Sequence, residues 1–178
     1  MIQEVQIKKH FLLDDYVVFD IATSGLSPED SSFLLGIFAI RIEKGEIAER
    51  FNKIVRNQEE LSEFMTDATK ITNEMMKRGE SAEQVLNDFQ VFCGNLTLAA
   101  HNAEFEVNFL NYYFQKYGFQ ALNQPVIDSL ELVRKAYPEI KRYSLTQLAQ
   151  FFDFDTNNQN PEFGVETTRM LLEKLREF

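Results

Sequence analysis

The chain has 178 residues, of which 44% are hydrophobic, and its formal net charge is −10. This length suits one domain with a sizeable core, and the charge disfavours general binding of polyanions by a basic surface. A nucleic-acid partner held by a few local contacts is not excluded. No apolar run approaches the roughly 18 residues that span a bilayer, so we expect no membrane partner. The single cysteine, Cys93, favours a reducing, cytoplasmic location.

The first half of the sequence reads as strands. Residues 1–15 show no usable pattern, so we expect an N-terminal extension followed by one domain over residues 16–178. Residues 16–22 are apolar nearly throughout, which predicts a strand buried on both faces. Residues 33–42 and 46–55 are predicted to form a hairpin, because Glu43-Lys44-Gly45 supplies a turn.

The second half alternates short strands with helices. A helix is predicted over residues 81–95, with a capping box of Ser81 and Gln84 and an end at Gly94. A strand, a helix, a strand and three further helices follow. Their ranges are 96–102, 103–118, 125–128, 129–137, 144–152 and 160–175. Ser144 with Gln147 and Asn160 with Pro161 are the expected starts of the last two helices.

This order of elements predicts an α/β fold with a mixed five-stranded sheet flanked by helices. Ligands of such sheets bind beyond the strand ends. Asp20 and His101 each follow an apolar strand, so we expect the two side chains to meet in space. Asp128 also ends a strand, and we assign it a structural role.

Four blocks carry a resemblance to a known family. They are VVFDIATSGLS, AAHNAEFEVNFLN, PVIDSLELVRKAYP and YSLTQLAQFF. In order and spacing they resemble the DnaQ-like, or DEDDh, 3′–5′ exonucleases of the ribonuclease H-like fold, such as the DNA polymerase III epsilon subunit. The resemblance covers residues 16–175. It implies a hydrolase in which Mg²⁺ or Mn²⁺ ions, held by four carboxylates, act with a histidine base.

The match to this family's catalytic residues is incomplete. Asp20 matches the first acid, and Glu106 stands where the third acid, normally Asp, belongs. The other three positions are degenerate: Ala22 replaces the second acid, Gln159 the histidine and Gly164 the last acid. A slip of one residue would put Asn160 at the histidine instead, and neither amide can take a proton at neutral pH.

We therefore expect a pseudoenzyme, with Asp20 and Glu106 as the remaining catalytic and metal-binding positions and one weakly held ion or none. Loss of a general base alone typically costs about 10²–10⁴ in rate. Alternatives stay open at several positions. Ala22 could be an engineered change, Gly164 could reflect a close contact, and His101 could simply hydrogen-bond inside the fold. Substitute ligands could come from the acids Asp153, Asp155 and Glu162.

The resemblance also implies contacts to nucleic acid. By position in the family's motifs these fall on Thr23, Gly25, Leu26, His101, Asn102 and Phe105. Phe105 could stack on a terminal base, although its helical spacing also suits a core residue. The expected partner is a single-stranded 3′ end or a replication or repair protein. An active nuclease with rearranged ligands and a purely structural interaction module remain alternatives. DNA or RNA as substrate, and the oligomeric state, are open.

Overall fold

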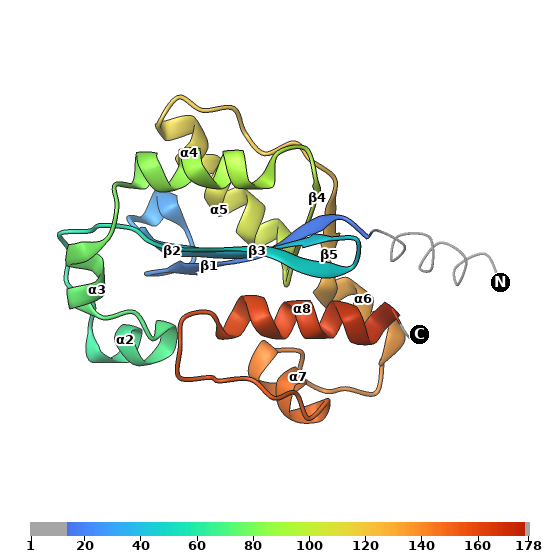
Figure 1. Cartoon of the computed structure of the whole chain (residues 1–178). Coiled ribbons are helices and arrows are strands. Elements are labelled where there is room, and N and C mark those ends of the chain that lie inside the picture. The colour runs from blue at the N-terminus through green and yellow to red at the C-terminus, as the bar shows by residue number, and fades with distance from the viewer. Residues whose placement is uncertain (1–13, 177–178) are drawn as a thin grey trace.

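The computed structural model describes residues 14–176 of the chain. They form three layers, with a central sheet between two groups of helices (Figure 1). The predicted α/β fold with a mixed five-stranded sheet is confirmed. Of the expected N-terminal extension, residues 1–13 lie outside the described residues.

The sheet has the strand order β3-β2-β1-β4-β5. Its antiparallel half is the predicted hairpin beside the first strand, and β4 and β5 continue parallel to β1. The turn of the hairpin uses two residues with positive φ, Lys44 and Gly45, as type I′ turns require. The strands are β1 Tyr16–Thr23, β2 Leu34–Glu43, β3 Glu46–Ile54, β4 Thr97–Ala100 and β5 Val126–Asp128.

Helices cover both faces of the sheet (Figure 1). Helices α4 and α5 lie on one face and α8 on the other, with α6 and α7 packed around α8. The helices are α2 Glu63–Thr69, α3 Asn73–Arg78, α4 Ala82–Cys93, α5 Ala103–Lys116, α6 Ser129–Ala136, α7 Leu145–Phe151 and α8 Phe163–Arg176, and a short 3₁₀ turn, η1, spans Pro28–Asp30. None of the helices in residues 14–176 has the length and hydrophobicity needed to span a membrane.

Two helices were missing from the predicted order of elements. The hydroxyls of Ser62 and Thr72 cap α2 and α3 by accepting the N–H of Met65 and of Met75, each at 3.2 Å. Both helices were missed because they are too short for apolar periodicity to show.

The predicted helix starts need three corrections. Ser81 does cap α4, but Gln84 donates its amide to Asp88 rather than returning a bond to the cap. Ser144 bonds to the side chain of Gln147 without capping the backbone of α7. Helix α8 begins at Phe163, not at Pro161, because the Asn160 side chain instead accepts the Glu162 N–H in a turn ahead of the helix.

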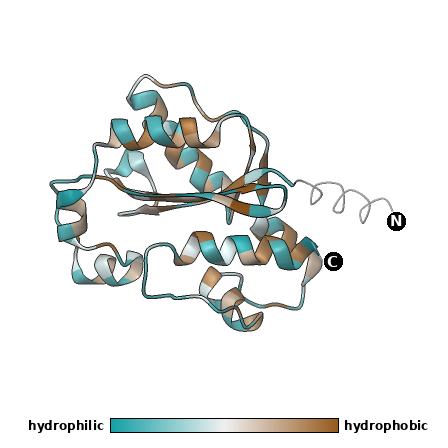
Figure 2. Cartoon of the chain, viewed as in Figure 1, coloured by the Kyte–Doolittle hydropathy of each residue, from teal (hydrophilic) through white to brown (hydrophobic). Residues whose placement is uncertain are grey.

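Strand β1 separates two clusters of buried side chains. Val17, Phe19 and Ile21 pack with α4 and α5, whereas Tyr16 and Val18 pack with α8 residues such as Val165. The strand is thus buried on both faces, as predicted, and hydrophobic residues are concentrated along the sheet in Figure 2. Because side chains alternate along a strand, Asp20 and Ala22 project on the α8 side of the sheet.

Candidate active site

The site lies at the end of β1, where Asp20 interrupts the apolar run. Its carboxylate is half-buried on the α8 side of the sheet. Burial disfavours the charged form, and it raises the pKa of Asp20 from 3.8 to about 7. A carboxyl group in this environment exchanges its proton near neutral pH unless a cation compensates the charge.

Glu106 reaches the same strand from α5 on the opposite layer. Its side chain is buried, and Oε2 accepts the backbone N–H of Ile21 at 2.9 Å. The pairing of β4 with β1 extends only to Val18, so Glu106 supplies an acceptor for β1 beyond the last paired residue. Burial, then the charge of Asp20, raises the pKa of Glu106, and the bond from Ile21 opposes this shift.

Gly164, at the expected position of the last acid, lies directly against Asp20. A Cβ atom at this position would lie 2.3 Å from Oδ2 and 2.6 Å from Cγ of Asp20. Cβ atoms in proteins essentially never make contacts this short. The backbone of α8 therefore lies directly against the Asp20 carboxyl group, and position 164 supplies no carboxylate of its own. The close contact considered from the sequence is confirmed, and it explains why this turn of helix carries glycine.

The remaining catalytic positions supply no replacement group. Ala22 is half-buried and packs against the cluster on the α8 face. Gln159 is exposed, and its hydrogen bonds go to the side chains of Asn157 and Asn158. It lines a pocket with residues of α2 and α3 and with Lys70, which directly follows α2. Asp153 and Asp155 are exposed.

We expected His101 to meet Asp20, but the hydrogen bonds of the His101 ring are made with other residues. Its Nδ1 lies 2.9 Å from the Ser129 hydroxyl and its Nε2 lies 2.7 Å from the Tyr143 carbonyl. Burial lowers the pKa of His101, which favours the neutral ring. The alternative of a histidine that hydrogen-bonds inside the fold is confirmed, because both ring nitrogens are engaged by residues outside the carboxylate pair.

Asp128 acts where its strand ends, as expected of a structural residue. Its carboxylate accepts the backbone N–H groups of Asn102, Ala103 and Leu130 at 3.0, 3.1 and 2.8 Å. It thereby satisfies the first turn of α5 and caps α6.

Three of the predicted nucleic-acid contacts gather at one pocket of about 360 Å³, here called the Phe105 pocket. It lies between residues 26–29 and residues 102–112, at the start and along most of α5, and Leu26, Asn102 and Phe105 line it. Thr23 and Gly25 shape the loop instead. The Thr23 hydroxyl donates to the Gly25 carbonyl at 2.7 Å, and a Cβ at Gly25 would lie 2.4 Å from the Ser32 hydroxyl. Nucleic-acid contact by these residues stays a prediction.

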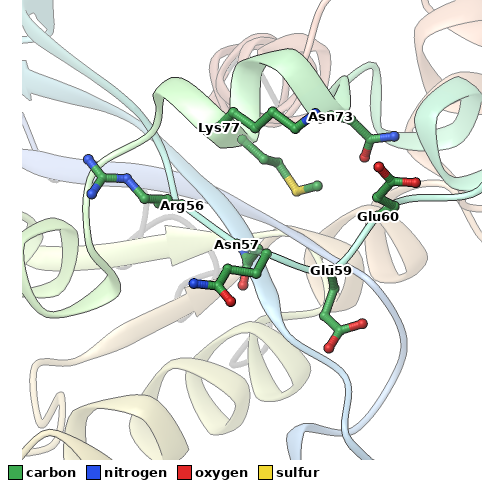
Figure 3. A pocket seen from close by; sticks show the side chains of 8 residues that line it. Arg56, Asn57, Glu59, Glu60, Asn73 and Lys77 are labelled. Atoms are coloured by element: carbon green, nitrogen blue, oxygen red, sulfur yellow. The ribbon is translucent and has the colours of Figure 1, made fainter.

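A second pocket, of about 310 Å³, lies between the segment after β3 and helix α3 (Figure 3). It carries charges of both signs, from Arg56 and Lys77 and from Glu59 and Glu60. The amides of Asn57 and Asn73 that line it already bond to backbone groups. Because the lining has both positive and negative side chains, it does not favour a ligand of either charge, and we assign this pocket no function.

The donor set does not fit the two-ion centre that the family resemblance implies. Hard dications such as Mg²⁺ and Mn²⁺ require several oxygen ligands each. The described residues contain no group of three or more His, Cys, Asp or Glu side chains able to hold a metal ion. Glu106 already accepts a backbone bond, and Gly164 closes one side of Asp20. Within residues 14–176, the proposed substitute acids do not complete a site either.

Comparison with known proteins supports the resemblance. The model of a family described as Exonuclease matches residues 17–159, which is most of the chain. The chain belongs to the DnaQ-like exonuclease family. The match of this exonuclease domain to the family model ends at Gln159, just before α8.

Curated relatives and solved structures agree with this assignment. PolC-type DNA polymerase III of Streptococcus mutans is 39% identical over 158 residues, covering 88% of this chain and 11% of the polymerase. The PolC-type enzyme of Halalkalibacterium halodurans is 39% identical over 163 residues, 90% of this chain and 11% of that protein. The exonuclease domain thus spans about a tenth of these relatives.

Two solved structures show the same fold. E. coli exonuclease I in complex with a dA16 oligonucleotide has a TM-score of 0.75 at 14% identity, covering 93% of this chain and 42% of that one. The nuclease domain of 3′hExo, a DEDDh family member bound to rAMP, has a TM-score of 0.69 at 17% identity, covering 93% and 92%.

The raised pKa of Asp20 predicts a pH-dependent stability. A carboxyl whose pKa is higher in the folded chain contributes stability that is fully present below pH 3.8 and is lost as pH rises to about 7. Asp20→Asn cannot ionise, so its free energy of unfolding should decline less over this window. Urea denaturation at a series of pH values measures the slope. The exposed Asp30→Asn serves as the matched control substitution, and an equal slope in wild type and Asp20→Asn would contradict the prediction.

The Gly164 contact predicts a coupling between two substitutions. Alanine normally stabilises a helix by about 1 kcal/mol over glycine. Here Gly164→Ala should instead lower the free energy of unfolding by about 1–3 kcal/mol, because its Cβ overlaps the Asp20 carboxyl. In an Asp20→Ala background the sign should reverse. A double-mutant cycle by chemical denaturation tests this, and equal effects in both backgrounds would show that the contact is absent.

Proposed function

We propose that this exonuclease domain has lost efficient cleavage of nucleic acid and serves as a binding module. One observation supports the proposal most: the α8 backbone at Gly164, the position expected for the fourth carboxylate, lies directly against the Asp20 carboxyl group. With Ala22 at the second position, only Asp20 and Glu106 remain of the four acids. Two carboxyl groups that are partly neutral would bind two metal ions weakly. The negative charge that develops on the phosphate during cleavage would then not be stabilised.

The loss of the base acts in the same direction. Gln159 and Asn160 carry amides, which cannot accept a proton from an attacking water. A missing general base alone costs about 10²–10⁴ in rate. Cleavage would therefore be slow even if one ion were held at Asp20.

We also propose a biological process for this domain, based on its relatives. The similarity to a tenth of PolC-type DNA polymerase III supports a role in DNA replication, beside a single-stranded 3′ end or a replication or repair protein. The exposed Leu26 and the aromatic lining of the Phe105 pocket support retained binding there. A cytoplasmic location and a single domain over residues 16–178 belong to the same proposal.

A cleavage assay tests the proposal. The purified chain is incubated with end-labelled single-stranded DNA or RNA in Mg²⁺ or in Mn²⁺. We expect no progressive 3′ shortening above the level given by the matched Asp20→Asn variant, prepared identically to control for contaminating nucleases. Shortening by the wild-type chain at enzymatic rates, absent from Asp20→Asn, would falsify the proposed loss of cleavage and favour an active nuclease with rearranged ligands.

A further inference from the structure

The lining of the Phe105 pocket combines large apolar side chains with polar ones. Leu26, 86% exposed, lines it together with the half-buried Phe105, whose ring packs on the buried Phe109 with the two ring centroids 5.8 Å apart. Pro28 and Tyr112 complete the apolar lining. At about 360 Å³ the pocket is at the small end of the roughly 300–1,000 Å³ of ligand sites, so it suits one large side chain or one base.

The charge around this pocket is negative. Glu29 and Glu104 both line it and both are exposed, whereas the lining formed by described residues includes no Lys, Arg or His. A polyanionic backbone would bring phosphates beside two carboxylates with no cation to compensate them. Lysine or arginine would instead gain an ion pair at the rim.

A further feature that could attract a phosphate, the N-terminus of α5, is already partly occupied. Helix N-termini bind anions through their free N–H groups. At α5 the N–H groups of Asn102 and Ala103 donate to the carboxylate of Asp128, so an internal anion fills this position. The exposed Glu104 adds negative charge in the first turn of the helix. The apolar side chains of Leu26 and Phe105, the acidic rim and the partly occupied helix end therefore favour the same kind of ligand.

We propose that the Phe105 pocket binds a segment of a protein partner that inserts an aromatic or large aliphatic side chain between Leu26 and Phe105, with lysine or arginine beside it facing Glu29 and Glu104. The inserted side chain supplies the buried contact, as anchors of protein interfaces commonly do. The flanking cations supply orientation and selectivity against nucleic acid. This inference names the partner class of the proposed binding module and rests on that proposed function.

Peptide binding offers a direct test because the chain contains no tryptophan. The probe is a blocked heptapeptide with a central tryptophan flanked on each side by two lysines, and its indole fluorescence is followed as the chain is added. Two control peptides replace the tryptophan by glycine, followed through a terminal fluorescent label, or the lysines by glutamate. We expect saturable binding of the probe that weakens with salt, and at least about tenfold weaker binding of both controls.

Four variants locate the binding. Leu26→Ala should weaken binding of the probe peptide at least about fivefold. Glu104→Gln should weaken it about two- to threefold at low salt. Each has a matched control elsewhere on the surface. Phe64→Ala removes another exposed side chain, 78% exposed on α2, and Glu83→Gln removes an acid from the first turn of α4. Both controls should bind as wild type does, and all four positions are exposed enough to leave the fold intact.

Two results would overturn the inference. The first is a probe affinity that is equal in all four variants, since binding would then lie elsewhere or be general attraction to an acidic surface. The second is tighter binding of a single-stranded oligonucleotide that is lost in Leu26→Ala and strengthened in Glu104→Gln, which would assign the pocket to nucleic acid. Neither result bears on cleavage, so failure here is distinguishable from failure of the proposed loss of nuclease activity.

Discussion

The close contact between Asp20 and the backbone of Gly164 is the constraint on which the rest of the candidate active site depends. Helix α8 packs closely on β1, and at the carboxylate this closeness is possible only for a residue without a Cβ atom. A side chain at position 164 would have to push the helix away or rotate Asp20. The same approach buries Asp20, which raises its pKa and weakens its value as a charged ligand.

Glu106 shows how an acid at a catalytic position can take a structural role. One extra methylene compared with aspartate extends its reach, and it accepts the Ile21 N–H where pairing with β4 has ended. Removing this acceptor would leave a buried donor unsatisfied. At the start of α5, Asp128 accepts the first backbone N–H groups, while Leu26 and Phe105 line a pocket with an acidic rim. Under the two proposals, the carboxyl pair holds metal ions weakly, while the acidic rim beside it attracts basic side chains.

The sequence predicts the sheet well because its strands are marked locally. The apolar run of β1 and the glycine turn after β2 identify strands without reference to the rest of the chain. The short helices α2 and α3 escape prediction because six or seven residues are too few to show a period. The site is harder still. The missing acids are visible as Ala22 and Gly164, but the partner of Glu106 lies 85 residues away and the contact of Gly164 crosses between layers. Such contacts depend on how helices dock on the sheet, which no local pattern encodes.

The central claim is that two carboxyl groups, one pressed against a helix backbone, cannot seat a pair of dications. Calorimetric titration of the purified chain with Mn²⁺ tests it most directly, with Asp20→Asn as the matched control. The account predicts the same small heats for both proteins up to millimolar Mn²⁺. Two ions bound per chain at submillimolar concentration, with binding lost in Asp20→Asn, would contradict it.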